Sequence, residues 1–162
     1  MLKICTIATT IILSTSSVFA GNLGISLDEL LNNIEKSAKT DGGSLEIKKI
    51  NCAENPMPGD ASKKIVSCSH SLRGDKIFIT NAELSGKLLD ISTQSWSEAD
   101  AGKMIGWIAA AVSKKDANSL NTDATKLVAE AKKSNVGSGE IGKGSFIAML
   151  MGNAYLISVS AP

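Results

Sequence analysis

The chain has 162 residues, with 17 basic side chains, 16 acidic side chains and one histidine. Loss of Lys3 with the N-terminal segment described next would leave 16 of each charge, so no excess of Lys and Arg remains to bind nucleic acid or an anionic membrane. A single histidine excludes H-E-x-x-H zinc sites and any site that needs several imidazoles.

Residues 1–20 have the pattern of a secretory signal peptide: a basic start at Lys3, an apolar stretch over 4–13 and a small-residue cleavage site at Ala20. The apolar stretch has about half of the roughly 20 residues needed to cross a bilayer. We therefore expect cleavage and no transmembrane segment in the mature chain. The sequence predicts a periplasmic or secreted protein, with residues 21–162 forming a single α+β domain.

The mature chain would keep two cysteines, Cys52 and Cys68, after Cys5 is removed. An even pair in an oxidising compartment predicts a disulfide, and the turn-rich segment 55–60 suggests that it ties the ends of a loop between two strands. Closing a loop of about 15 residues stabilises by roughly 3 kcal/mol in the chain-entropy model. A reactive thiol pair is the alternative, but the spacing is not C-x-x-C, so a structural bridge is favoured.

A helix is predicted to begin after Ser26, which forms a capping box with Glu29, while Ile25 can pack on Leu30. Gly42-Gly43 would end it. The apolar residues at helical spacing are Leu27, Leu30, Leu31, Ile34 and Ala38.

Three strands are predicted next, at about 45–52, 63–71 and 76–80, bounded by the 55–60 loop and by Arg73-Gly74-Asp75. Such spacing is typical of an antiparallel meander. The β-branched residues in these strands are Ile47, Ile65, Val66, Ile77 and Ile79.

Residues 81–95 fit two interpretations. Alternation of Leu84, Gly86 and Leu88 indicates a fourth strand, whereas a cap of the Thr80-x-x-Glu83 type would begin a helix. Strand is favoured, because Gly86 would weaken a short helix.

Two helices are predicted after this, at about 98–114 with Ser97 as its cap and at about 120–134. The first carries small residues at four-residue intervals, Gly102, Gly106 and Ala110, on which another backbone could pack closely. The second helix is the expected neighbour. Trp96, just before the first, is the aromatic residue expected at the surface, and Trp107 is expected in the core.

The C-terminal segments 146–151 and 154–160 flank Gly152-Asn153 and predict a tight hairpin. The first strand is apolar on both faces, with Phe146, Ala148 and Leu150 on one face and Ile147, Met149 and Met151 on the other. The favoured interpretation is a central strand covered on both sides. The alternative is that Ile147, Met149 and Met151 form an apolar binding face for a ligand or partner, since Met side chains adapt to varied surfaces.

Two motifs suggest chemistry and are set aside. Residues 137–144 resemble a phosphate-binding loop, but Gly144 stands where a Ser or Thr should hold magnesium, so a flexible Gly-rich linker is predicted. His70 could form a triad with a serine and Asp60 or Asp75, but no G-x-S-x-G elbow identifies the nucleophile, and a hydrogen-bonded structural histidine is favoured. No catalytic, cofactor-binding or metal-binding residue is assigned, and no cofactor is expected.

These elements predict one α+β domain, in which an antiparallel sheet made of a meander and a C-terminal hairpin carries about three helices. The leading functional hypothesis is an exported protein-binding module, such as a periplasmic inhibitor or immunity protein against a cell-wall enzyme or toxin. Its partner would be another exported or envelope protein. A carrier of a small apolar ligand or lipid is the alternative, a hydrolase is third, and a non-enzymatic role is favoured. The sequence assigns no oligomeric state.

Overall fold

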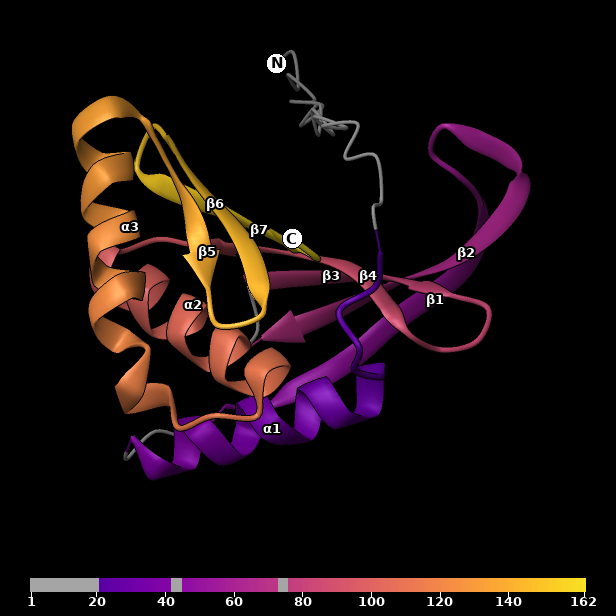
Figure 1. Ribbon diagram of the computed structural model, residues 1–162, viewed down its shortest axis with the longest axis horizontal. Helices are drawn as coiled ribbons and strands as arrows, with labels where there is room; N and C mark the ends of the chain where they lie inside the picture. The colour runs from indigo at the N-terminus through magenta and orange to yellow at the C-terminus, as the bar shows by residue number, and fades with distance from the viewer. Residues whose placement is uncertain (1–20, 42–44, 73–75) are drawn as a thin grey trace, which may run out of the picture.

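The computed structural model describes residues 21–41, 45–72 and 76–162, and within them the chain forms a seven-stranded antiparallel sheet with three α-helices (Figure 1). The strand order is β1-β2-β3-β4-β7-β6-β5. The predicted α+β class is confirmed. In chain order the elements are α1 (Leu27–Thr40), β1 (Ile47–Met57), β2 (Asp60–Leu72), β3 (Lys76–Glu83), β4 (Leu88–Ser95), α2 (Glu98–Ser113), the 3-10 turn η1 (Ala117–Ser119), α3 (Asn121–Ser134), β5 (Val136–Ile141), β6 (Gly144–Met151) and β7 (Ala154–Ser160).

Three sequence predictions lie outside the described residues. They are the signal peptide at 1–20, the helix end at Gly42-Gly43 and the strand boundary at Arg73-Gly74-Asp75.

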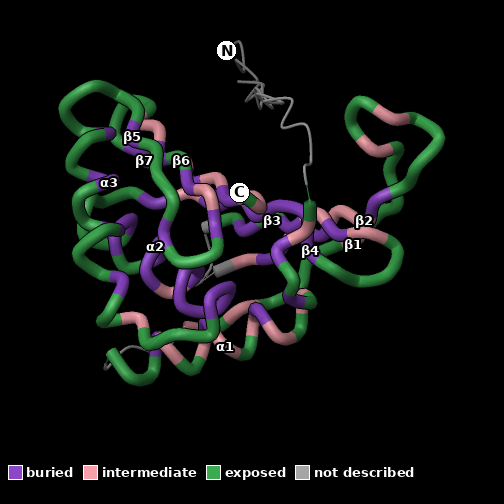
Figure 2. Tube along the Cα trace, in the orientation of Figure 1, coloured by how far each residue is buried: buried purple, intermediate pink, exposed green. Residues whose placement is uncertain are grey.

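The helices gather on one face of the sheet, and the core lies between the two layers (Figures 1 and 2). Strand side chains alternate between faces, so one face of each strand points at the helices. The fully buried residues in this layer include Leu30 and Ile34 of α1, Ile105 and Ile108 of α2, and Phe78, Ile91, Phe146 and Ile157 of the sheet.

Both predicted helix starts are confirmed by their caps. The Ser26 hydroxyl accepts the Glu29 backbone N–H at 3.2 Å, and the Ser97 hydroxyl accepts that of Asp100 at 3.1 Å. A cap of this kind satisfies backbone N–H groups that have no partner inside the helix. α2 ends one residue earlier than predicted, because Lys114 takes a left-handed conformation (φ 55°).

The small-residue side of α2 faces α3, as predicted. The atoms nearest to an added Cβ are side-chain oxygens of α3: Thr125 Oγ1 at 3.9 Å from the Gly102 position and Asn121 Oδ1 at 3.8 Å from Gly106. The two helices therefore meet at these positions through side chains and not through bare backbone.

The predicted loop at 55–60 is wrong, because strand pairing continues through most of it. Asn55 pairs with Ile65 and Pro56 with Lys64, and only Pro58-Gly59 turns the chain. Gly59 has φ +83°, which glycine adopts without strain. The cross-strand pairs extend β1 and β2 into a longer hairpin than the sequence indicated.

The ambiguous segment 81–95 is divided between two strands. β3 continues to Glu83, a turn containing Gly86 (φ +87°) follows, and β4 begins at Leu88. The preference for strand is confirmed over Leu88–Ser95, whereas Leu84 lies in the turn, where its side chain is 61% exposed.

The prediction of a flexible Gly-rich linker at 137–144 is wrong, because this segment contains the edge strand β5. Each residue from Val136 to Ile141 pairs with β6. α3 packs directly on β5, and a Cβ at Gly137 would overlap the carbonyl oxygen of Leu127 in that helix. Glycine here allows a helix and a strand to approach closely.

Candidate functional site

The most prominent feature of the surface is the outer end of the β1–β2 hairpin, residues 53–64, which we call the arm. It projects from the rest of the protein at the right of Figure 1. Every residue of the arm is exposed except Met57 and Asp60, which are half-buried. The arm therefore adds almost nothing to the hydrophobic core.

A disulfide lies at the base of the arm. Cys52 and Cys68 are direct cross-strand partners, with Cα atoms 4.1 Å apart, and their bond confirms the predicted pairing. It joins neighbouring strands of a hairpin and not the ends of a loop, because pairing continues past the cysteines. Cys68 is 5% exposed, so the bridge stands where the hairpin leaves the core.

The side chains of the arm are polar and pair with one another. Lys64 Nζ lies 3.4 Å from a Glu54 carboxylate oxygen, and Lys63 Nζ lies 3.4 Å from that of Asp60. Asp60 also accepts hydrogen bonds from the hydroxyl and backbone N–H of Ser62, which lower the pKa of its carboxyl group. Such exposed pairs stabilise weakly. They leave the arm without a strong net charge.

The free edge of β1 carries features that discourage another strand from pairing with it. The register shifts between Lys49 and Asn51 and again between Pro56 and Met57, and Pro56 has no backbone N–H to donate. Bulges, lysines and prolines are the usual protection of sheet edges. The arm is thus suited to present side chains to a partner, while these features keep another strand from pairing with the backbone edge of β1.

A second surface is the side of the sheet away from the helices, which we call the open face. Ile147 and Met151 are 38% and 51% exposed there, and Met149 is half-buried. The prediction that β6 is covered on both sides is wrong, because α2 and α3 pack on its opposite face, where Phe146 and Ala148 are buried, and Ile147 and Met151 stay exposed.

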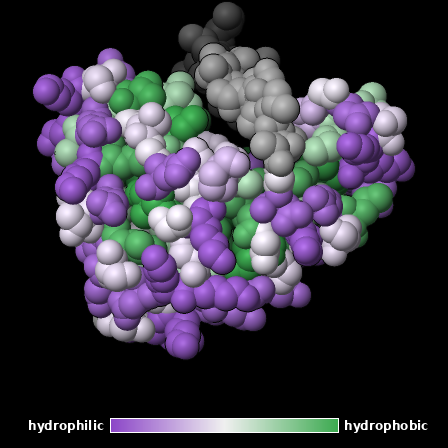
Figure 3. Space-filling model, viewed as in Figure 1, coloured by the Kyte–Doolittle hydropathy of each residue, from purple (hydrophilic) through white to green (hydrophobic). Residues whose placement is uncertain are grey.

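The apolar part of the open face is wider than the three residues found from the sequence. Ile77 and Ile79 of β3 and Val136 of β5 are also exposed, by 49%, 40% and 49%. Sequence periodicity could not add them, because their position beside β6 depends on strand order. Figure 3 shows apolar residues reaching the surface at the upper left, where Figure 1 places the α3–β5 connection and the β6–β7 turn.

One row of residues across the open face carries no charged side chain. The register aligns Ser69, Ile79, Ser92, Ser158, Ile147 and Ser138 in one row across six strands. A parallel row is polar and consists of Ser67, Asn81, Asp90, Ser160, Ser145 and Glu140. Within it Asn81 donates to Asp90 at 2.8 Å, and burial raises the pKa of the Asp90 carboxyl group.

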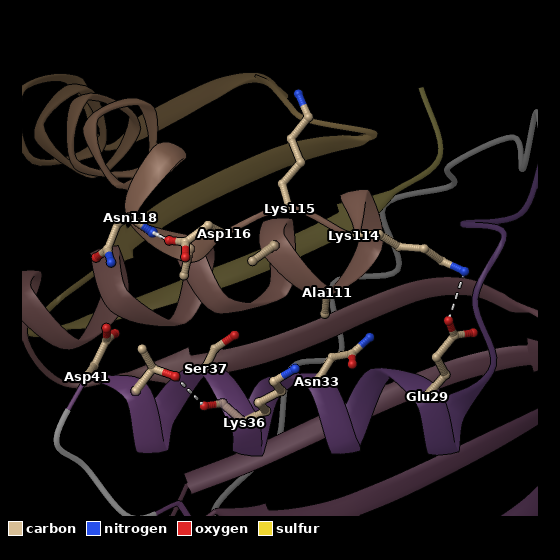
Figure 4. A pocket seen from close by; sticks show the side chains of 13 residues that line it. Glu29, Asn33, Lys36, Ser37, Asp41, Ala111, Lys114, Lys115, Asp116 and Asn118 are labelled. Carbon is tan, nitrogen blue, oxygen red and sulfur yellow. Dashed lines mark hydrogen bonds and ion pairs between the residues drawn. The ribbon is translucent and has the colours of Figure 1, made fainter.

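A third feature is a pocket of about 440 Å³ (Figure 4). It is lined by α1 on one side and by the C-terminal end of α2 and the following η1 turn on the other. Its polar groups take part in structural contacts: Lys114 pairs with Glu29 at 3.0 Å, and Asp116 caps η1 by accepting the Asn118 N–H at 2.7 Å. The pocket includes none of Ile147, Met149 and Met151, so it gives the carrier hypothesis no support.

The two tryptophans differ in environment. Trp96 is 53% exposed, as expected. Trp107 is half-buried and not fully in the core, because its indole N–H reaches the chain after α1 and donates to Asp41 at 2.6 Å.

His70 is 1% exposed, and its environment differs from the prediction. Neither ring nitrogen has a hydrogen-bond partner among the described residues. The ring stands edge-on to Phe78, with centroids 6.1 Å apart, and Lys49 is its cross-strand partner. Burial, and secondarily the positive charge of Lys49, lower the pKa of the imidazole. His70 therefore lies in an apolar environment that disfavours the charged imidazolium form of its side chain.

We expect His70 to make stability depend on pH. Because its pKa is lower folded than unfolded, the unfolded chain binds the proton first as pH falls below about 6.5. The free energy of unfolding then decreases, by at most about 1.4 kcal/mol per pH unit, until the folded-state pKa is reached. Urea denaturation of the protein and of His70→Phe between pH 7.5 and 5 measures this. A stability difference between the two that does not change with pH would contradict it.

No family model, curated protein or solved structure matches the chain. Within the described residues, His, Cys, Asp and Glu side chains form no group of three that could hold a metal ion. Of the helices in this part of the chain, none is long and apolar enough to span a membrane.

Proposed function

We propose that the protein is an exported protein-binding module and that the arm is its recognition element. The observation that carries the proposal is a disulfide at the base of a ribbon that is exposed almost throughout. The partner would be another exported or envelope protein, and inhibition of, or immunity to, a cell-wall enzyme or toxin is the form of binding that we favour.

The arm is difficult to explain by stability alone. A two-stranded hairpin without a core is marginal in water, and the 53–64 segment buries little apolar surface. A cross-link at its base removes freedom from the unfolded chain and keeps the two strands paired. Ordering a binding segment before it meets its partner lowers the entropic cost of association. A pre-ordered ribbon is therefore what a binding element requires.

The chemistry of the arm suits a protein surface. Its charges are balanced within the arm, so binding would rest on shape, hydrogen bonds and apolar contact, and not on attraction between opposite net charges. Met57 and Pro58 stand at the tip, and the flexible thioether side chain of a methionine adapts to the surface it meets. A disulfide also requires an oxidising compartment, which is where such a partner would be met.

Truncation of exposed side chains on the arm tests the proposal, because it removes their hydrogen-bonding groups and changes the shape of the surface that the arm presents. We expect the triple variant Glu54→Ala, Lys63→Ala, Lys64→Ala to lose at least about 10-fold in affinity for a partner captured from the native envelope, as for residues at the centre of an interface. Folding stability should change little, since these side chains are exposed. Affinity is measured by titration calorimetry with the purified partner.

The matched control carries three charge removals on α3: Asp123→Ala, Lys126→Ala and Lys133→Ala. These residues are also exposed and include an ion pair at 3.7 Å. The control should bind as the unaltered protein does. Loss of binding by the α3 variant with full binding by the arm variant would refute the proposed role of the arm.

A further inference from the structure

We propose that the open face pairs with the open face of a second copy of this chain, forming a two-fold symmetric dimer with its two sheets in contact. This inference goes beyond the proposed function, because it rests on the surface across β2, β3, β4, β7, β6 and β5 and not on the arm. Two sheets pack in this way about 10 Å apart, with their strands nearly aligned.

The charge distribution favours self-association. The row through Ile79 and Ile147 is otherwise made of serines, and the charged residues Asp90 and Glu140 lie in the neighbouring polar row. The buried centres of protein interfaces are poor in charged residues, and this row contains none. A copy of the same face brings no charge against the Ile79–Ile147 row, and the nearest like charges are the two Asp90 carboxylates, which would lie on either side of the axis in the neighbouring row.

The strand order makes the face complementary to itself. A two-fold axis parallel to the strands and between β4 and β7 exchanges β3 with β6, because each lies next to one of the central pair. In an isologous contact, residue i meets j′ and j meets i′. Ile79 would then meet Ile147 of the second copy, and Ser92 would meet Ser158, since the register places these four residues in one row.

The rows on either side bring further residues of the two copies opposite each other. Ile77 lies two residues before Ile79 and Met149 two residues after Ile147, and because β3 and β6 run in opposite directions both are displaced toward the same end of the strands. They would meet across the interface. In the polar row the hydroxyl of Ser160 would meet the carboxylate of Asp90. Ile77 thus opposes Met149 and the Ser160 donor opposes the Asp90 acceptor, whereas Gln94 would oppose Leu156.

The size of the face is sufficient. Six strands, β2 to β5 in sheet order, about 4.8 Å apart and about six residues long measure roughly 29 Å by 20 Å, a flat area of about 600 Å². Accessible area exceeds the flat projection because side chains protrude. Specific interfaces bury about 800 Å² per partner, so the face is in the right range.

The test uses protein purified after expression of the full chain and measures its mass by light scattering and sedimentation equilibrium. We expect a dimer for the unaltered protein at micromolar concentration. Ile147→Glu and Ile79→Lys each place an unpaired charge in the centre and should raise the dimer dissociation constant at least about 100-fold. Both side chains are exposed in the single chain, so the domain should still fold.

Mixing the two monomeric variants tests the pairing itself. In a mixed dimer the carboxylate introduced by Ile147→Glu in one chain would face the ammonium group introduced by Ile79→Lys in the other. The remaining Ile79 would face the remaining Ile147, so the mixture should dimerise although neither variant does alone. Leu84→Lys, in the β3–β4 turn, is the control and should remain dimeric. A monomeric unaltered protein, a dimer that survives Ile147→Glu, or a mixture of folded variants that stays monomeric would each overturn the proposal.

Discussion

Gly137→Ala is expected to lower the free energy of unfolding by about 3 kcal/mol or more, and it has the largest predicted effect of any single substitution discussed for this protein. The added Cβ would overlap the carbonyl oxygen of Leu127 and lie 3.0 Å from the backbone nitrogen of Ala131. Both atoms belong to the backbone of α3, so no side-chain rotation can relieve the overlap. Either α3 or β5 must move, and both are packed into the core.

Gly139→Ala is the matched control, two residues further along the same strand. There the nearest atom to an added Cβ is Leu127 Cδ1 at 3.9 Å, an ordinary contact at the end of a side chain. We expect a change of less than about 1 kcal/mol, within the range of strand propensities. Urea denaturation of the two variants measures the difference. Equal stabilities would show that α3 does not approach β5 at Gly137 as described.

Removing the disulfide is the second large change. The variant with Cys52→Ala and Cys68→Ala should lose about 3 kcal/mol of stability, because the bridge closes a segment of 16 residues and its loss returns that freedom to the unfolded chain. The arm should lose order first, since it has few contacts outside its own hairpin. Urea denaturation measures the loss of stability, and amide hydrogen exchange over 53–64 measures the loss of order in the arm.

A reductant provides the control for this change. It should destabilise the unaltered protein to the same extent and leave the double variant unaffected, since that variant has no bridge to reduce. Exchange of α3 and β5 amides should accelerate far less than exchange in the arm, because these elements lie at the other end of the sheet. A uniform increase over the whole sheet would be contrary to the idea that the bridge mainly orders the arm.

The sequence predicted the parts of the fold that depend on local chemistry. Ser26 and Ser97 indicate where their helices begin, because a short hydroxyl side chain beside an apolar periodicity is typical of a helix cap. Gly152, with φ +65°, marks the β6–β7 turn for a similarly local reason. The disulfide was predicted from the even number of cysteines in residues 21–162 and from the oxidising compartment that the N-terminal pattern led us to expect. None of these inferences required knowledge of which strands are neighbours.

The errors arose where neighbours in space decide the structure. β5 contains glycines at 137 and 139 and has no apolar alternation, so only its pairing with β6 and the approach of α3 make it a strand. The two apolar faces of β6 suggested two covering layers, whereas the described helices lie on one side. The segment 55–60 was likewise expected to be a loop, but Pro56 pairs with Lys64, so most of the segment belongs to the paired strands of the arm.

The candidate site was found only in part for the same reason. Ile147, Met149 and Met151 were identified from alternation within one strand, but Ile77 and Ile79 join them only through strand order. The arm was missed because a run of polar residues around two prolines is also typical of a loop. The disulfide flanking that run was the signal that could have identified it, since a cross-link at a hairpin base favours extended strands beyond it.

Site-specific cross-linking shows whether the arm is the part of the protein that contacts a partner. A photoreactive residue at Ala61, which is exposed on β2, or at Lys126, which is exposed on α3, would be incorporated into the protein in the cells that produce it naturally and activated by light. We expect position 61 to form a cross-link to one protein partner and position 126 to form none. Cross-linking of that partner from position 126 but not from position 61 would show that the arm is not the recognition element.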